Sequence, residues 1–370
     1  MIYKKAKFKN YRNLKEEKLE FCKNTNIFYG QNAQGKTNLL EMLYLFSGNR
    51  SFRGAKDQEQ ALFESDGYVA ELEFFAEERE QTAKIVFNKK DKQKKQIEIN
   101  GVKKNSRLFL MEKIKAVIFS PEHLALIKEG PASRRKFLCS ALCSLKVKNA
   151  NVLYRHNKIL NQRNALLKDI CKHPDLKETL SIWDESLITC GSTLTHEAFK
   201  FTQKLNQKAN EYHKGISGGA EELTVEYISS VGAKSDDTTE QIKEKYKKTL
   251  EKNQRSDIYM GATTAGFQRD DIEIKINGKS VKAYGSQGQQ RSAVISLKLA
   301  EAAIIEETFG EKPVILLDDV LSELDFDRRR FLTEKIKDFQ VFITLCEGLE
   351  ENSDTDAFIF DVADGNVKRR

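Results

Sequence analysis

The chain carries a complete G-x-x-x-x-G-K-[ST] loop at residues 30–37, which read Gly-Gln-Asn-Ala-Gln-Gly-Lys-Thr. A short apolar run, residues 27–29, precedes the loop, and apolar residues at helical spacing follow it: Leu39, Leu40, Leu43 and Phe46. Strand, loop and helix in this order are typical of a phosphate-binding loop, because a helix N-terminus attracts anions. The pattern predicts an α/β fold with a nucleotide site, and the alternative is an ordinary glycine-rich turn.

Several positions of this loop have expected roles. Gly30 and Gly35 let the backbone turn its N–H groups toward a triphosphate. Lys36 can reach the β- and γ-phosphates and is a candidate catalytic residue, and the Thr37 hydroxyl can hold Mg²⁺. We therefore expect ATP and Mg²⁺ as cofactors. The candidate nucleotide-binding residues are Gly30, Gln31, Asn32, Ala33, Gln34, Gly35, Lys36, Thr37 and Asn38.

A second motif lies far along the chain, where residues 314–317 form an apolar run that ends in Asp318 and Asp319. This pattern is typical of a strand that is buried on both faces of a parallel sheet and meets a ligand at its carboxyl end. Asp318 suits a Mg²⁺ ligand, and Asp319 suits a catalytic group that orients or deprotonates attacking water. The alternative is a buried strand that ends in a solvated Asp-Asp turn.

A third motif, Ser286-Gln287-Gly288-Gln289, leads into a strong helix pattern at residues 293–300. The Ser286 side chain and the free N–H groups of the first helical turn again predict an anion site. A single ATP has no need of both loops from one protomer. The order phosphate loop, Ser-x-Gly-Gln loop, Asp-Asp strand and Ser322-Glu323-Leu324-Asp325 resembles the ATP-binding-cassette (ABC) family.

In the ABC family, ATP is held between the phosphate loop of one subunit and the Ser-x-Gly-Gln loop of another. The resemblance therefore implies a homodimer that is closed by ATP. It implies trans nucleotide contacts from Ser286, Gln287, Gly288 and Gln289, and it places Asp325 at the dimer seam. The implied fold class is α/β: an ABC-type P-loop ATPase head with a mixed sheet and an inserted helical lobe.

Within that superfamily, segments along most of the chain resemble the RecF family of bacterial DNA replication and repair proteins. They are Phe8-Lys9-Asn10-Tyr11-Arg12-Asn13-Leu14, residues 30–38, Phe119-Ser120-Pro121-Glu122, Arg134-Arg135-Lys136-Phe137-Leu138, Gln162-Arg163-Asn164, Arg269-Asp270-Asp271, the Ser286 loop and residues 317–325. The resemblance implies an ATP-dependent clamp with weak DNA-stimulated ATPase activity. It also implies binding to DNA gaps and single-strand/double-strand junctions, and recombinase loading with RecR and RecO as partners.

The chain departs from the RecF pattern at four positions. It has Phe267-Gln268 where the family usually has Pro-His, and it has His123 and Cys139 where the family usually has aspartate. These positions are distant in sequence from the nucleotide motifs. We therefore expect the departures to alter local surface or DNA contacts before they affect ATP binding.

Composition is ordinary for a soluble protein with two lobes, with 39% hydrophobic and 32% charged residues among 370. No apolar run approaches the roughly 20 residues that span a bilayer, and no signal-peptide pattern follows the first lysines, so we expect a cytoplasmic protein. The resemblance to the RecF family implies that it is associated with the nucleoid. The six cysteines and five histidines show no zinc-binding spacing. Reduced thiols and no structural metal are expected.

Net charge is +7, and its distribution suggests where nucleic acid could bind. Lysines gather in residues 89–104, around a hairpin-like Asn100-Gly101, and basic residues follow at 134–136. Such groups can neutralise phosphates, although a lysine run can equally be a solvated face. The chain has no base-reading motif, so recognition of backbone and shape is expected.

The order of the motifs predicts the domain organisation. Strand-like segments dominate residues 1–122, and helix-favouring sequence follows at 134–143, 149–168 and 176–210, with a further helix predicted at 238–253. Because nucleotide motifs lie near both ends, we expect an ATPase lobe from residues 1–122 and 214–370, interrupted by a helical lobe at 123–213.

Three other functions share these motifs. An ATP-hydrolysing subunit of a membrane transporter is the alternative from another class, but such subunits usually have Glu after the strand Asp and His after the next strand. This chain has Asp319 and Cys346 there. An insertion of about ninety residues is too short for the coiled coils of chromosome-structuring ATPases. A scaffold that is switched by ATP with negligible turnover stays open, because binding and hydrolysis use the same residues.

Overall fold

The computed structural model describes residues 1–91, 94–346 and 357–370, which form two compact units. The first unit comprises Met1–Leu124 and Val294–Arg370, and the second comprises Ala125–Ala293. The sequence analysis placed the end of the helical lobe at residue 213, but the second unit extends further. The strands that follow this residue pair with one another and pack against the helices of the unit. No helix in the described ranges is long and apolar enough to cross a membrane.

A six-stranded sheet lies at the centre of the first unit. β3, β8, β12, β13 and β14 run parallel, and β15 pairs antiparallel with β14. Every residue of β12 and β13 is buried, as is typical of central parallel strands. Because parallel strands end at one edge, the residues that follow β3, β12 and β13 meet there. Across the sheet the order is β15 (Asn366–Arg369), β14 (Phe358–Ala363), β3 (Thr25–Tyr29), β13 (Val341–Leu345), β12 (Val314–Leu317) and β8 (Ala116–Phe119).

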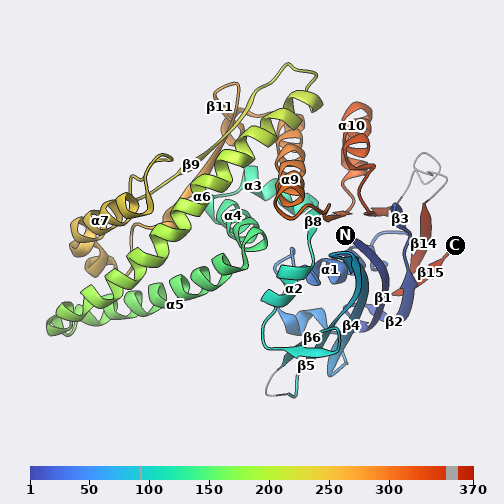
Figure 1. The fold of residues 1–370 in the computed structure, drawn as a ribbon, viewed down its shortest axis with the longest axis horizontal. Helices are drawn as coiled ribbons and strands as arrows, with labels where there is room; N and C mark the ends of the chain where they lie inside the picture. Colours follow the sequence, from blue (N-terminus) through green and yellow to red (C-terminus); the bar gives the residue numbers. More distant parts are fainter. Residues whose placement is uncertain (92–93, 347–356) are drawn as a thin grey trace. The chain divides into compact units, whose positions relative to one another are not determined.

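A second, antiparallel sheet belongs to the same unit. Its strands alternate buried and more exposed residues, so one face lies on the core. Helix α1 (Lys36–Leu45) packs against both sheets, since Leu39 and Leu43 share a core with Phe8 of β1 and Phe342 of β13 (Figure 1). The strand order is β2 (Leu14–Glu20), β1 (Ile2–Tyr11), β4 (Gly67–Ala76), β5 (Arg79–Asn88), β6 (Lys95–Ile99) and β7 (Val102–Lys104).

The remaining elements of the first unit are short helices and turns. They are η1 (Asp57–Gln60), α2 (Leu108–Lys113), η2 (Pro121–Leu124), η5 (Leu321–Glu323) and α10 (Phe326–Ile336). Helix α9 (Gln287–Phe309) begins in the second unit and ends in the first. The mixed central sheet and the intervening helical unit confirm the predicted fold class.

Long helices make up most of the second unit, and α5 and α6 lie side by side (Figure 1). Helix α7 begins at a capping box formed by Thr238 and Gln241 and ends at Gly261, whose φ of 60° suits glycine. A small sheet with the order β11 (Lys279–Ser280), β10 (Asp271–Ile276) and β9 (Leu223–Ile228) completes the unit. The other elements are α3 (Ala125–Lys128), α4 (Pro131–Leu145), α5 (Val147–Ile170), η3 (Pro174–Thr179), α6 (Leu180–Ile216), α7 (Thr239–Met260), η4 (Phe267–Arg269) and α8 (Val281–Tyr284).

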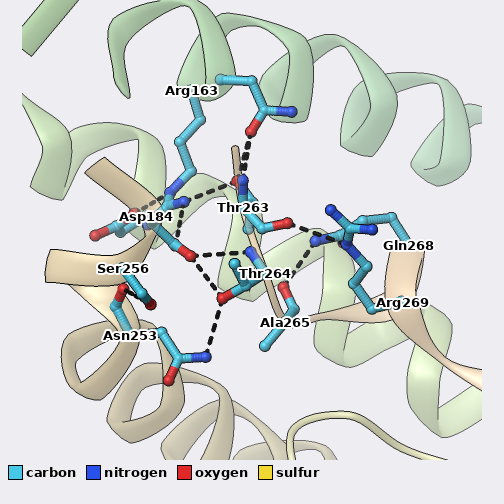
Figure 2. Close-up of polar contacts among 11 residues, drawn as sticks. Arg163, Asp184, Asn253, Ser256, Thr263, Thr264, Ala265, Gln268 and Arg269 are labelled. Atoms are coloured by element: carbon cyan, nitrogen blue, oxygen red, sulfur yellow. Dashed lines mark hydrogen bonds and ion pairs between the residues drawn. The ribbon is translucent and has the colours of Figure 1, made fainter. Parts of the chain in front are cut away.

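A fully buried arginine joins three helices of this unit. Arg163 Nε donates to Asp184 Oδ1 at 2.6 Å, and Nη1 donates to Asp257 Oδ2 at 2.8 Å. Nη1 also donates to Thr263 Oγ1 at 2.7 Å. Figure 2 shows Arg163 beside Asp184 and Thr263. Arg163 belongs to α5, Asp184 to α6 and Asp257 to α7, so one guanidinium group connects all three helices. Two carboxylates compensate the cost of burying this charge.

Candidate functional site

The two glycines of the phosphate loop meet different constraints. A Cβ atom at Gly30 would lie 2.3 Å from the carbonyl oxygen of Val362 in β14, so a side chain does not fit there. Gly35 has a φ of 118° and caps the N-terminus of α1. Ala33, between them, also has a positive φ, 64°. The resulting curled backbone before a helix N-terminus is the arrangement of an anion-binding loop.

Lys36 is buried and folds back over its own loop. Its Nζ donates to the carbonyl oxygens of Gly30 at 2.6 Å and Gln31 at 2.8 Å, and it lies 3.2 Å from Cys346 Sγ. The Cys346 thiol donates to Asn32 Oδ1 at 2.9 Å. All these partners are neutral, so a phosphate at the loop would offer the ammonium group a stronger, charge-assisted hydrogen bond.

Thr37 and Asp318 meet where α1 begins and β12 ends. The Thr37 hydroxyl donates to Asp318 Oδ1 at 2.8 Å. The pKa of Asp318 is raised to about 6, chiefly by burial and also by the charges of Glu122 and Asp319, while hydrogen bonds from the Thr37 and Thr344 hydroxyls oppose the shift. In the described part of the chain, no three His, Cys, Asp or Glu residues are grouped for a metal. A hydroxyl and a carboxylate nevertheless fit Mg²⁺, which takes few protein ligands beside phosphate oxygens and water.

Asp319 has a left-handed backbone conformation, with a φ of 52°. Its N–H donates to Thr344 Oγ1 at 2.8 Å, and its Oδ1 accepts from Ser322 Oγ at 3.0 Å. Thr344 Oγ1 also donates to Asp318 Oδ1 at 3.2 Å, so one hydroxyl holds both acidic residues. The sequence analysis missed this role of Thr344. A polar residue near the end of the buried strand β13, beside β12, is the signal that could have revealed it.

The turn between β14 and β15 supports the phosphate loop, which the sequence analysis also missed. The Gly365 N–H donates to the Gln34 carbonyl at 3.2 Å, and the Asp364 N–H donates to Gln34 Oε1 at 2.6 Å. Asn13 Nδ2 donates to the same carbonyl at 3.1 Å, and Asn38 Nδ2 donates to Asn13 Oδ1 at 2.7 Å. The adjacent Asp-Gly pair, a common hairpin turn, is the sequence signal for this support.

The Ser286 loop lies in the second unit and forms a capping box at the start of α9. The Ser286 N–H donates to Gln289 Oε1 at 2.9 Å, and the Gln289 N–H donates to Ser286 Oγ at 3.2 Å. Ser286 and Gln287 are exposed, and Gly288 is half-buried. One of the N–H groups that the sequence assigned to an anion is therefore occupied by the cap.

Asp325 caps the N-terminus of α10. Its Oδ1 accepts from the Arg328 N–H at 3.0 Å, and its side chain forms an ion pair with that of Arg328. These contacts lower the pKa of Asp325. Asp325 is exposed in the single chain. A residue that lies at a dimer seam must be exposed before the two copies join.

Two basic motifs prove to be partly engaged within the protein. Arg134 binds Asp271 in a bidentate manner, with Nε and Nη2 at 2.8 and 2.7 Å from its two oxygens, and Arg135 Nη1 donates to the Asp270 carbonyl at 3.2 Å. In the lysine run, Lys90 pairs with Asp66, Lys95 pairs with Asp57, and Lys89 binds the Ser65 carbonyl. Lys92 and Gln93 of that run lie outside the described residues. DNA contact by these segments stays a prediction.

The departures from the RecF pattern have local structural roles. Phe267 is buried with its ring edge-on to His156, and Gln268 Nε2 donates to the Ala265 carbonyl at 2.7 Å. His123 Nδ1 accepts from the Ser120 N–H at 3.1 Å, and burial raises the pKa of the Cys139 thiol to about 12. Phe267 therefore affects interior packing, whereas the sequence analysis expected a surface effect.

The phosphate loop before α1, the acidic end of β12 and the mixed sheet define an ABC-type P-loop head. A model of the RecF/RecN/SMC N-terminal domain matches residues 3–367. The DNA replication and repair protein RecF of Ruminiclostridium cellulolyticum is 39% identical over 370 residues, with 99% of each chain covered. The chain belongs to the RecF family.

Solved structures agree with this assignment. The structure of the recombination mediator protein RecF-ATPrS in the RecFOR pathway superposes with a TM-score of 0.93 and 37% sequence identity. The match covers 99% of this chain and 97% of the solved chain. The Smc head domain of Pyrococcus furiosus bound to the C-terminal domain of ScpA has a TM-score of 0.55 and 15% sequence identity. That match covers 100% of this chain and 96% of the solved chain. The second likeness concerns the fold alone.

Proposed function

We propose that this protein is an ATP-dependent DNA-binding clamp that acts in DNA repair and replication. The observation that carries the proposal is the meeting of Lys36, Thr37 and Asp318, which brings an ammonium group, a hydroxyl and a carboxylate to one edge of the central sheet. The curated relatives are DNA replication and repair proteins, and solved relatives are named for RecF with ATP and with ATPrS. These relatives favour a clamp over the transporter alternative.

In this proposal Lys36 exchanges the carbonyl oxygens of Gly30 and Gln31 for the β- and γ-phosphates of ATP. Thr37 and Asp318 would hold Mg²⁺. When bound, this ion would neutralise the charge that develops on the phosphates. Asp319 accepts a hydrogen bond from the attacking water and orients it. Thr344 and Ser322 keep Asp319 in the required position.

A second copy of the chain completes the site. Its Ser286, Gln287, Gly288 and Gln289 close over the γ-phosphate, where the positive end of α9 favours negative charge. Asp325 lies at the seam between the two copies. Hydrolysis removes the γ-phosphate contact, so the dimer reopens.

The proposed output of this cycle is controlled binding to gaps and single-strand/double-strand junctions, with weak, DNA-stimulated hydrolysis. The +7 net charge supports an electrostatic contact with phosphates rather than with bases. A solved relative is described as a recombination mediator in the RecFOR pathway, which supports RecR and RecO as partners in recombinase loading.

Lys36→Ala tests the nucleotide site most simply. We expect ATP affinity to fall about a hundredfold, since two hydrogen bonds to charged groups are lost. Isothermal titration calorimetry with ATP and Mg²⁺ measures this change. Lys84→Ala, which removes an exposed lysine paired with Glu71, is the matched control and should bind ATP as the wild type does. Equal ATP affinity in both variants would show that residues 30–37 are not the nucleotide site.

A further inference from the structure

Gln289 makes two side-chain contacts at the start of α9. Its Oε1 accepts from the Ser286 N–H at 2.9 Å, and its Nε2 donates to Glu221 Oε1 at 2.8 Å. Both contacts use the same planar amide group, whose oxygen accepts and whose nitrogen donates. The carboxylate of Glu221 therefore fixes the orientation in which Gln289 shapes the Ser286 loop.

Glu221 is itself held at the end of α6. Its Oε2 lies 2.9 Å from Nε2 of His213, which is fully buried in the last turns of that helix. The Glu221 N–H donates to Ser217 Oγ, just beyond the helix, at 3.3 Å. One carboxylate thus bridges the end of α6 and the start of α9, with a partner on each oxygen.

The strand that follows Glu221 is attached to the same helix. The Leu223 N–H donates to Asn210 Oδ1 at 3.0 Å, and the Val225 N–H donates to Asn206 Oδ1 at 2.7 Å. β9 is an edge strand of its sheet, so side chains of α6 occupy N–H groups that would otherwise be open. The backbone that carries Glu221 is therefore fixed to α6.

We propose that Glu221, held by His213, is a positioning residue for the Ser286 loop and couples the C-terminal end of α6 to closure on the partner's nucleotide. This inference rests on the proposed function, because it requires Ser286 to dock on ATP in a second copy. Helix α6 is a single 37-residue element, and Asp184 near its other end binds Arg163 (Figure 2). A displacement of α6 would reach the Ser286 loop through Glu221.

Glu221→Ala removes both carboxylate contacts and leaves the phosphate loop unchanged. We expect the ATP-dependent dimer to weaken about five- to tenfold, as is typical when a coupling contact is lost, while ATP affinity of the protomer stays near that of the wild type. Glu222→Ala is the matched control, since Glu222 is adjacent and exposed. Sedimentation with ATP and Mg²⁺ gives the dissociation constant of each dimer, and calorimetry gives the affinity of each protomer for ATP.

A double-mutant cycle with Gln289→Ala separates positioning from a general loss of structure. We expect the double variant to be no weaker than Gln289→Ala alone, because Glu221 acts through Gln289. If Glu221→Ala is unfolded in a thermal melt, Glu221→Met, which keeps the length of the side chain but cannot accept from Gln289 Nε2 as a carboxylate does, takes its place in the cycle. Additive effects, an unchanged dimer, a loss of ATP affinity in Glu221→Ala or an equal loss in Glu222→Ala would overturn the inference. Failure of the wild type to dimerise with ATP would instead overturn the proposed function.

Discussion

Thr344 shows at the scale of one residue how the site is held together. Its single hydroxyl accepts from the Asp319 N–H and donates to Asp318 Oδ1, so the two acids keep a fixed separation. Asp319 also needs this contact because its backbone lies in the left-handed region, where non-glycine residues carry strain. In the proposed mechanism, hydrolysis therefore depends on a residue that contacts neither phosphate nor metal.

Thr344→Val keeps the shape of the side chain and removes its hydroxyl. We expect ATP hydrolysis to fall about tenfold, since a hydrogen bond to a charged group contributes about 1.5 kcal/mol. Single-turnover assays at saturating ATP measure this effect. Thr308→Val, which removes a hydroxyl that donates to the Ile304 carbonyl within α9, serves as the control. Equal hydrolysis by the two variants would contradict the assigned role of Thr344.

Asp319→Asn separates nucleotide binding from hydrolysis. Asparagine tolerates a positive φ, so the backbone is expected to persist while the negative charge and most of the proton affinity are lost. We expect hydrolysis to fall about a hundredfold or more, and ATP-bound dimers to accumulate on DNA. Phosphate release and dissociation from gapped DNA are the measurements. A normal hydrolysis rate would shift attention to Glu323 or Asp325.

The candidate phosphate-binding residues could be proposed from the sequence because the chemistry of a phosphate loop restricts residue type and spacing. Thr37, next to Lys36 in the phosphate loop, contacts Asp318 in the structure, although the two lie far apart in the chain. The role of Thr344 and the contact of Gln34 with the C-terminal hairpin were not predictable in the same way. Their roles depend on neighbours across the sheet, and many polar residues at a strand end or in a loop would look the same in the sequence.

At the scale of elements, the long helices were the more predictable part. The expected helices at 134–143, 149–168 and 176–210 correspond to α4, α5 and α6. α4 and α5 extend a few residues further at both ends, whereas α6 begins later than expected, after η3, and ends later. The C-terminal hairpin β14–β15 was missed, although its turn contacts the phosphate loop. The end of the helical lobe also lies later than expected, because β9 pairs with β10 and is covered by α6 rather than joining the central sheet.

Gly365→Ala tests the contact between this hairpin and the phosphate loop. The new Cβ would lie 2.0 Å from the Asn13 carbonyl oxygen, so the turn must move away from Gln34. Gly101→Ala is a matched control, because both glycines have a φ of +75° but Gly101 has open space around it. We expect the free energy of unfolding of both variants to fall by about 1 kcal/mol because of backbone strain. Only Gly365→Ala should also lose ATP affinity in calorimetry, and an equal ATP affinity would contradict the supporting role.

At the scale of the whole molecule, the nucleotide motifs are distributed over the two units of the chain. The first unit carries the phosphate loop, Asp318 and Asp319, and the second carries Ser286. A complete nucleotide site in the proposed mechanism therefore draws on both units, and on two copies of the chain. In the proposed mechanism ATP is the ligand that joins the two copies, so ATP-dependent dimerisation is the central claim.

Sedimentation of the pure protein with and without ATP tests that claim most directly, with Ser286→Arg measured alongside the wild type. Arginine at residue 286 would fill the space where the facing γ-phosphate docks, but it leaves the protomer's own phosphate loop intact. The account predicts a monomeric wild type without nucleotide, a dimer with ATP and Mg²⁺, and a Ser286→Arg variant that binds ATP and stays monomeric. A wild type that is equally dimeric in both conditions, or a Ser286→Arg variant that dimerises normally with ATP, would contradict it.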